Sequence, residues 1–385
     1  MARTLKSDRT LFLATMLLVA ASVVMVYSAS AVQADARYQM SYLFLSKQLM
    51  WAVLGTSVMW AAMRVDYHVY QRPAFVWAFL AATAVLLVAV FLFPSRNGTQ
   101  RWIILGVFSL QPSELAKLAT IFFTASLLER RMHRVNDPGY VLVPIGLVVA
   151  TLAGLILKEP DFGTAAVVVG VATLMVFAAG LTYRYVFGAA IVLLPAAMVI
   201  AMSSAYRLER LKTFLDPWKD PLGQGFQIIH SLYAVGTGGL FGKGLMAGVE
   251  KLYYLPEPHT DFIYAVIGEE LGLVGTTLVL AAFALIAWRG LRASLLAPDR
   301  FGSLLALGIT MMVVLQALVN ISVVTKLLPT KGIPLPFVSA GGSSLLISML
   351  AMGILLNISQ QCSATASATT AAGRRTDWTI SGQEA

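Results

Sequence analysis

One stretch of the chain, residues 255–272 with the sequence LPEPHTDFIYAVIGEELG, brings ionisable side chains against the beginning of an apolar helix. Asp261 stands where two prolines end and the apolar run FIYAVI begins, which predicts a helix N-terminus. Free backbone N–H groups there favour a carboxylate anion, whereas nearby hydrocarbon opposes it, and this balance suits a general base. In the alternative interpretation, Asp261 only caps the helix, and Glu269 and Glu270 begin a solvated face.

A second polar stretch, SRNGTQRWIILGVFSLQPSELAKL, puts Arg101 and Trp102 before a predicted helix that carries Glu114 and Lys117 near its start. Glu114 and Lys117 are three residues apart, so they share a helix face and can form an ion pair. An ion pair in hydrocarbon is costly, and ionisable residues at membrane depth are often functional. The sequence leaves both roles open.

A third stretch, KLLPTKGIPLPFVSAGGSSLL, contains three prolines and Lys331. Such an irregular entry into a helix is tolerated at membrane depth only where protein or water satisfies the backbone, so it predicts a cavity. Upstream, Gln316 and Asn320 are four residues apart and should join neighbouring helices. Asp161, in the turn KEPDFGT, is expected at a helix start, as is Asp261.

The glycine-rich stretch AVGTGGLFGKGLMAG contains Lys243. Backbone N–H groups that glycines leave accessible can hold a pyrophosphate, which is one interpretation. A flexible or re-entrant turn is the other, because the stretch lacks the spacing of a phosphate-binding loop.

Composition identifies the class of protein. Hydrophobic residues make up 58% of the 385 residues and charged residues only 12%, and the mean hydropathy of +0.76 predicts a polytopic membrane protein. The net charge of +9 lies mainly in short loops, and no nucleic-acid-binding motif is present, so we expect no nucleic-acid partner. A single cysteine, Cys362, and four scattered histidines predict neither a disulfide framework nor a zinc site.

The apolar runs predict an all-α fold of about ten transmembrane helices. After a first helix at residues 11–31, the spans are expected near 48–64, 75–93, 114–130, 141–157, 162–180, 185–203, 271–289, 302–324 and 341–359. A large extracytoplasmic loop, about residues 204–270, then lies between helices seven and eight. Arginine-rich loops predict cytoplasmic N- and C-termini. Residues 1–361 form the transmembrane domain, and we expect a disordered cytoplasmic tail at 362–385.

Six motifs in the same order resemble the SEDS proteins (shape, elongation, division and sporulation), a family of polytopic bacterial cell-wall polymerases. They are VYSAS, NGTQRWIILGVFSLQPSELAK, RLKTFLDPWKDPLGQGFQ, SLYAVGTGGLFGKGL, YLPEPHTDFIYAVIGEELG and LPTKGIPLPFVSAGGSS. The resemblance covers about residues 8–361, and the PTKG spelling is closer to the division and sporulation members than to the elongation member. The chain departs from the family by PEPH in place of PEAH and SAGG in place of SYGG, which affects fine substrate contacts.

The resemblance implies a peptidoglycan glycosyltransferase that polymerises lipid II into a growing glycan strand at the outer face of the bacterial cytoplasmic membrane during cell division. It also implies a class B penicillin-binding protein and other division proteins as partners. The aspartate of the HTDF spelling, held essential in the family, is Asp261 here. The resemblance also carries over Arg101 and Trp102 of the RW spelling and Lys117 of the SELAK spelling. Four further residues lie in matched motifs with less defined roles: Glu114, Glu257, His259 and Lys331.

The chemistry agrees with this assignment. One base must take the proton of the attacking sugar hydroxyl, and cations must stabilise the departing pyrophosphate. Asp261 would be the base, and Arg101, Lys117 and Lys331 would meet the pyrophosphate, with or without a divalent cation and with no other cofactor. A lipid II flippase or a scaffold that recruits the penicillin-binding protein are the rival functions.

Overall fold

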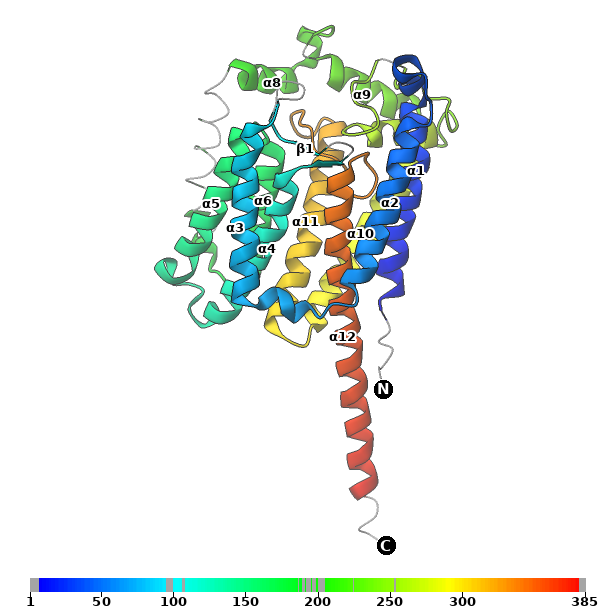
Figure 1. Cartoon of the computed structure of the whole chain (residues 1–385). Coiled ribbons are helices and arrows are strands. Elements are labelled where there is room, and N and C mark those ends of the chain that lie inside the picture. Colours follow the sequence, from blue (N-terminus) through cyan, green and yellow to red (C-terminus); the bar gives the residue numbers. More distant parts are fainter. Residues whose placement is uncertain are drawn as a thin grey trace.

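The computed structural model describes residues 7–94, 100–105, 108–185, 187–188, 191, 195, 199, 205–223, 225–252 and 254–380. Within these residues the chain is a bundle of α-helices (Figure 1), as the sequence predicts. The helices are α1 (Arg9–Tyr38), α2 (Leu43–Ala62), α3 (Pro73–Ala89), α4 (Pro112–Arg131), α5 (Val143–Lys158), α6 (Phe162–Ala178), α8 (Ala205–Leu215), α9 (Phe226–Thr237), α10 (Ile263–Leu296), α11 (Arg300–Val324) and α12 (Gly342–Ile380).

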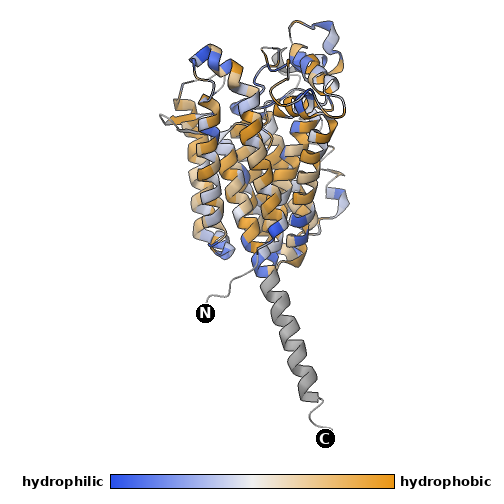
Figure 2. Ribbon diagram, turned by 90° about the vertical axis from the view of Figure 1, so that its right-hand side faces the viewer, coloured by the Kyte–Doolittle hydropathy of each residue, from blue (hydrophilic) through white to orange (hydrophobic). Residues whose placement is uncertain are grey.

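Apolar residues dominate the long helices, and polar residues gather at both ends of the bundle (Figure 2). In the described part of the chain, six helical segments are long and apolar enough to cross a membrane. They are Arg9–Tyr38, Pro73–Leu92, Pro138–Lys158, Ile263–Leu296, Arg300–Val324 and Gly342–Cys362. The chain is therefore a multi-pass membrane protein.

Nine of the ten predicted spans overlap a helix of the structure. The prediction near residues 185–203 falls mostly outside the described residues. The eighth span is predicted to start at residue 271, and the structure breaks α10 at Gly272, so the longer part of α10 begins where the span is predicted. The shorter part begins at Ile263, next to the helix start predicted at Asp261.

The polar helix α4 occupies the middle of the bundle and contacts α3, α5, α6, α11 and α12. Its side chains from Pro112 to Thr124 are almost all buried, including Glu114 and Lys117. A helix with charges at this depth must be surrounded by protein, because lipid cannot solvate them. Close packing elsewhere uses small residues: a Cβ on Gly353 of α12 would lie 2.5 Å from the carbonyl oxygen of Met59 on α2.

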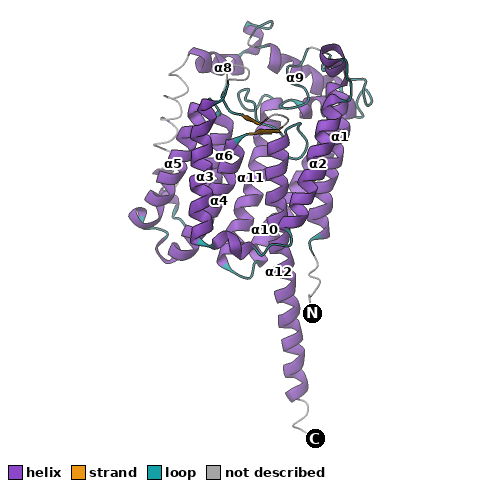
Figure 3. Cartoon of the chain, viewed as in Figure 1, coloured by secondary structure: helices purple, strands orange, loops and turns teal. Residues whose placement is uncertain are grey.

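One end of the bundle carries the irregular structure. There the strands β1 (Ile103–Leu105) and β2 (Phe108–Leu110) form an antiparallel hairpin with Ile104 opposite Ser109, an element that the sequence does not predict. The strands lie among loops at the same end as α8 and α9, and both termini lie at the opposite end (Figure 3). Short helical turns complete the fold at Tyr67–Gln71, Val90–Leu92, Met132–Arg134, Pro138–Leu142 and Pro217–Lys219.

The last helix, α12, continues past residue 361, where the sequence predicts the transmembrane domain to end, and reaches Ile380 (Figure 1). Extension of an existing helix needs no new nucleation, so α12 can continue beyond its packed part. The domain boundary, and the order of residues 362–385 in solution, stay predictions.

Candidate functional site

The segment between α11 and α12, residues 325–341, is non-helical, and its part from 333 to 339 is mostly buried. Two amides of α11 satisfy part of its backbone: Gln316 Nε2 donates to the carbonyl oxygen of Pro334 at 2.9 Å, and Asn320 Nδ2 donates to that of Ile333 at 2.7 Å. The prediction that these two residues make polar contacts is confirmed: Gln316 joins α11 to Lys117 of α4, and both residues also hold this segment. Irregular backbone is thus held at depth by protein groups.

The same segment frames Asp261, which directly precedes α10. Asn320 Nδ2 also donates to the carbonyl oxygen of Asp261 at 2.8 Å, and Ser339 Oγ donates to that of Thr260 at 2.5 Å. The Asp261 carboxylate lies against the backbone of Gly332, where an added Cβ would come within 2.7 Å of Oδ2. The position of Asp261 is therefore fixed from two sides.

The capping interpretation of Asp261 is wrong. The N-cap residue of α10 is Phe262, which makes no side-chain capping hydrogen bond. Glu269 and Glu270 do not begin a solvated face either, since both are fully buried. The sequence pattern locates the helix start correctly but does not reveal how the helix is covered.

Burial raises the pKa of Asp261 from its ordinary value to about 7, and the negative charges of Glu257 and Asp161 contribute to this rise. The positive charges of Arg101 and Arg210 oppose the rise in the pKa. With a pKa in this range, both the carboxylate and the carboxylic acid of Asp261 are populated near neutral pH. A group of this pKa can accept a proton at neutral pH and release it again.

Arg101 lies at the start of the hairpin and holds the turn after α5. Its Nε donates to the carbonyl oxygen of Glu159 at 2.8 Å and its Nη2 to that of Pro160 at 2.6 Å. The Glu159 carboxylate beside it is fully buried, and its oxygens have no hydrogen-bond partner among the described residues. Burial, assisted by Asp161, raises the pKa of Glu159 to about 8.

Three more charged residues belong to the site: Lys331, Asp161 and Arg210. The Lys331 Nζ lies 5.1 Å from the centre of the Phe162 ring, and burial lowers the pKa of Lys331 while Asp161 opposes that change. Asp161 is the N-cap of α6, as predicted, and accepts from Thr164 N at 3.1 Å. Sequence reasoning missed Arg210 of α8, whose Nη1 donates to the carbonyl oxygen of Thr330 at 3.1 Å.

The other residues predicted from the HTDF and RW motifs lie at the edge of this cluster. His259 is buried against the Phe44 ring, with 4.6 Å between ring centres, and burial lowers its pKa. Glu257 is exposed and has a left-handed backbone with a φ of 50°. Trp102, beside Arg101, is half-buried.

Glu114 and Lys117 form an ion pair inside the bundle, with 2.9 Å between Lys117 Nζ and Glu114 Oε2. Their side chains are only 1% and 2% exposed. The Lys117 ammonium also donates to Gln316 Oε1, and Gln316 holds the Pro334 carbonyl. The pair is thereby linked to the segment that contacts Asp261. The Lys117 ammonium already donates hydrogen bonds to two protein acceptors, Glu114 and Gln316.

Lys243 is separated from this cluster. Its Nζ pairs with Glu269 Oε1 at 2.8 Å, beyond the first turn of α10. The backbone N–H groups of Gly242, Lys243 and Gly244 all donate to carbonyl oxygens of the protein. The glycine-rich stretch is therefore a bonded turn and not an open cradle for pyrophosphate.

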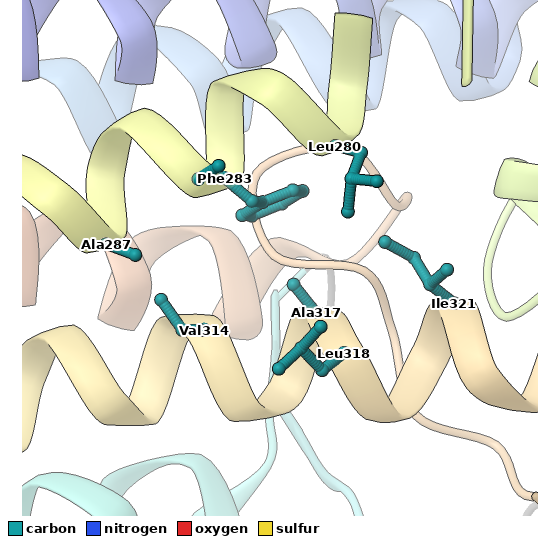
Figure 4. Close-up of a pocket in the computed structure, with 8 residues that line it drawn as sticks. Leu280, Phe283, Ala287, Val314, Ala317, Leu318 and Ile321 are labelled. Carbon is teal, nitrogen blue, oxygen red and sulfur yellow. The ribbon is translucent and has the colours of Figure 1, made fainter. Parts of the chain in front are cut away.

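Two further features concern ligands and partners. Within the described residues, no three His, Cys, Asp or Glu side chains come together to hold a metal ion. An apolar groove lies between α10 and α11 (Figure 4), and three of its eight lining residues are alanines. Its lining residues are Leu280, Phe283, Ala284, Ala287, Val314, Ala317, Leu318 and Ile321.

Comparison with known proteins agrees with this architecture. The model of the cell cycle protein family of FtsW, RodA and SpoVE matches residues 8–364. The chain belongs to this family. Stage V sporulation protein E of Bacillus subtilis is 43% identical over 92% of this chain and 97% of its own length. A probable peptidoglycan glycosyltransferase FtsW from a Geobacter species is 44% identical over 91% of this chain and 96% of its own length.

Solved structures share the fold. One chain of a peptidoglycan synthase complex that coordinates polymerization and crosslinking superimposes with a TM-score of 0.76 and 29% identity, covering 93% of this chain and 99% of that one. The rod shape determining protein RodA of Thermus thermophilus gives a TM-score of 0.68 with 26% identity, covering 92% and 97%. The resemblance inferred from the motifs is confirmed.

The charges around Asp261 predict opposite shifts of the pH profile. Glu257→Gln removes a negative charge that raises the pKa of Asp261, so the acidic limb of kcat/KM should move to lower pH. Arg210→Gln removes a positive charge, so the limb should move to higher pH. Arg210→Lys keeps the charge and should leave the limb in place. Shifts of the same sign in both charge-removing variants would contradict this electrostatic arrangement.

The Glu114–Lys117 pair predicts a stability effect. Lys117→Met leaves a buried carboxylate unpaired and should lower the free energy of unfolding by about 3–5 kcal/mol. Adding Glu114→Gln removes the unpaired charge and should restore most of that loss in a thermal unfolding measurement. If polymerisation also recovers in the double variant, Lys117 is not a pyrophosphate ligand. A double variant as unstable as Lys117→Met would contradict the pairing.

Proposed function

We propose that this chain is a peptidoglycan glycosyltransferase that polymerises lipid II into glycan strands at the outer face of the bacterial cytoplasmic membrane, with Asp261 as the general base. The observation that carries the proposal is the Asp261 carboxylate, whose pKa is raised to about 7 beside two arginines. The names of the relatives, matched along almost the whole chain, support the same reaction.

In this reaction the 4-hydroxyl of one lipid II sugar attacks the anomeric carbon of a second sugar that is linked to a lipid pyrophosphate. The new glycosidic C–O bond forms as the bond to the pyrophosphate breaks, and the hydroxyl proton passes to Asp261. A base with a pKa near the working pH is both deprotonated often enough and strong enough for this step. Asn320 donates to the carbonyl oxygen of Asp261, and the backbone of Gly332 lies against its carboxylate. These two contacts keep the carboxylate in one position.

The departing pyrophosphate gains negative charge, which nearby cations stabilise. Arg101, Arg210 and Lys331 are the cations that share the site with Asp261. Arg101 is held by two carbonyl oxygens, so its charge is in place before substrate binds. Lys117 and Lys243, both predicted to bind substrate, are paired with glutamates and are weaker candidates.

The orientation of the chain in the membrane follows from where its positively charged residues lie. Both termini lie at the end of the bundle opposite α8, α9 and β1 (Figure 1), and Arg101 of the site directly precedes β1. Arginines lie where helices finish at this end: Arg64 just after α2, and Arg130 and Arg131 in the last turn of α4. Under the positive-inside rule this end is cytoplasmic, and the site faces outward, where lipid II is polymerised.

The decisive variant is Asp261→Asn, which keeps the shape of the side chain and removes the base. Purified protein given labelled lipid II should lose at least about 100-fold of its polymer yield on a gel, while its thermal stability stays within a few degrees. Wild-type yield from folded Asp261→Asn would overturn the catalytic role. Transfer of lipid II across vesicles by wild-type protein, without any polymer, would indicate the flippase instead.

We further propose that the groove between α10 and α11 binds the transmembrane helix of a class B penicillin-binding protein. The structural neighbour functions in a complex that joins polymerization to crosslinking. Alanines in the groove permit a partner helix to approach closely, which is how helices associate in lipid. A division role and contacts with other division proteins belong to the same proposal.

Filling the groove should weaken this association. Ala284→Trp adds a large ring at the groove and should reduce co-purification of the penicillin-binding protein by about tenfold, as the loss of close helix packing predicts. Val85→Trp, on the exposed face of α3, is the matched control and should leave co-purification unchanged. Equal recovery of the partner from both variants would contradict the proposed interface.

A further inference from the structure

The helix α10 is broken at Gly272, where φ is 65° and ψ is −158°. Tyr264 Oη donates to the carbonyl oxygen of Thr276 at 3.4 Å. Twelve residues of straight helix would separate these positions by about 18 Å, too far for a tyrosine to reach. Residues 263–271 therefore form a half-helix that folds back on the rest of α10.

A break in a helix leaves backbone groups without intrahelical partners, and the glycine-rich turn supplies them. The N–H groups of Lys243 and Gly244 donate to the carbonyl oxygens of Glu269 and Glu270 at 2.9 and 3.0 Å. On the other side of the break, Leu273 N donates to the carbonyl oxygen of Gly239 at 2.9 Å. The turn is inserted into the break and closes it.

Only glycine fits at the points of closest approach. A Cβ on Gly238 would lie 1.9 Å from the carbonyl oxygen of Gly268, and one on Gly242 would lie 2.1 Å from that of Glu270. Gly242 also has a φ of 80°. The glycines of this turn therefore serve contact with the half-helix.

Two fully buried carboxylates fasten the end of the half-helix. Glu270 accepts from Ser28 Oγ on α1 at 2.6 Å, from Lys251 Nζ, and from Met246 N at 3.2 Å. Glu269 accepts from Lys243 Nζ at 2.8 Å and from Val249 N at 2.8 Å. Three segments distant in sequence thus meet at one helix end.

Asp261 lies immediately before the other end of this half-helix, about 13 Å away at helical rise. The half-helix from Ile263 to Glu270 is buried throughout, so it has little room to shift independently of its two ends. Any movement at Glu269 and Glu270 is then transmitted to the base. Position matters, because a displacement of about 1 Å can cost a reaction about 100-fold in rate.

We propose that Glu270 and Glu269, with their lysine partners, are positioning residues that act through the half-helix and, together with the contacts of Asn320 and Gly332, set the place of the Asp261 carboxylate. This proposal rests on the proposed function of Asp261. The four side chains have as hydrogen-bond partners one another, Ser28 and backbone N–H groups of residues 246–250. They act at the far end of a rigid element whose near end carries the catalytic group.

The test replaces the buried pair by neutral groups of similar size, Glu270→Gln with Lys251→Met. The amide oxygen introduced by Glu270→Gln can still accept from Ser28 Oγ and Met246 N, so the protein should fold. We expect kcat for lipid II polymerisation to fall by about 10- to 100-fold, with KM within about twofold of wild type because the substrate contacts remain. Glu269→Gln, a milder change, should lower kcat by less.

The matched control is the ion pair of Asp8 and Arg289 at the opposite end of the bundle, with 2.5 Å between Asp8 Oδ2 and Arg289 Nη2. Asp8→Asn with Arg289→Met should lower stability and leave kcat unchanged.

Wild-type kcat in a folded Glu270→Gln, Lys251→Met protein would overturn the positioning role. Failure of both this protein and Glu269→Gln to fold would also overturn it, since the glutamates would then serve the fold alone. Absence of polymer from wild-type protein would instead refute the proposed function.

Discussion

Backbone groups that leave a helix near the membrane must find partners in the protein, because hydrocarbon offers none. This constraint governs the outer end of the bundle. Asn320 satisfies carbonyl oxygens of both Asp261 and Ile333, and the glycine-rich turn satisfies the break at Gly272. The irregular segments that form the site are therefore as firmly bonded as the helices that carry them.

The charges of the site follow from the same burial. A carboxylate loses hydration when it is packed against Gly332 and the beginning of α10, so its anion is destabilised and its pKa rises. The positive charges of Arg101 and Arg210 stabilise the anion and so offset part of the rise in the pKa. The result is a base that titrates near neutral pH, next to cations that can meet a phosphate. Glu159, buried beside Arg101, experiences the same desolvation without a hydrogen-bond partner among the described residues.

Local patterns in the sequence identify much of this arrangement. The apolar runs predict the helices, the prolines before Asp261 predict a helix start, and the four-residue spacing of Gln316 and Asn320 predicts their common role. The motifs of the family add the identity of the site residues.

Local sequence patterns do not predict contacts between segments that are distant in the sequence. Glu270 meets Ser28 from 242 residues away, and Arg210 reaches Thr330 across 120 residues. Periodicity describes which face of a helix is apolar, but it does not tell which polar side chain will cover a buried glutamate. For this reason the sequence leaves a solvated face open as one interpretation of Glu269 and Glu270, and it leaves open both an anion cradle and a turn for the glycines that close the broken helix.

The central claim is that burial holds Asp261 as a base that titrates near pH 7. Infrared difference spectroscopy between wild-type and Asp261→Asn protein isolates the carboxylate band of this one side chain during a pH titration. The account predicts that the band appears with an apparent pKa of about 7. A band that is already fully developed at about pH 5, as for an aspartate with the ordinary pKa of 3.8, would contradict it.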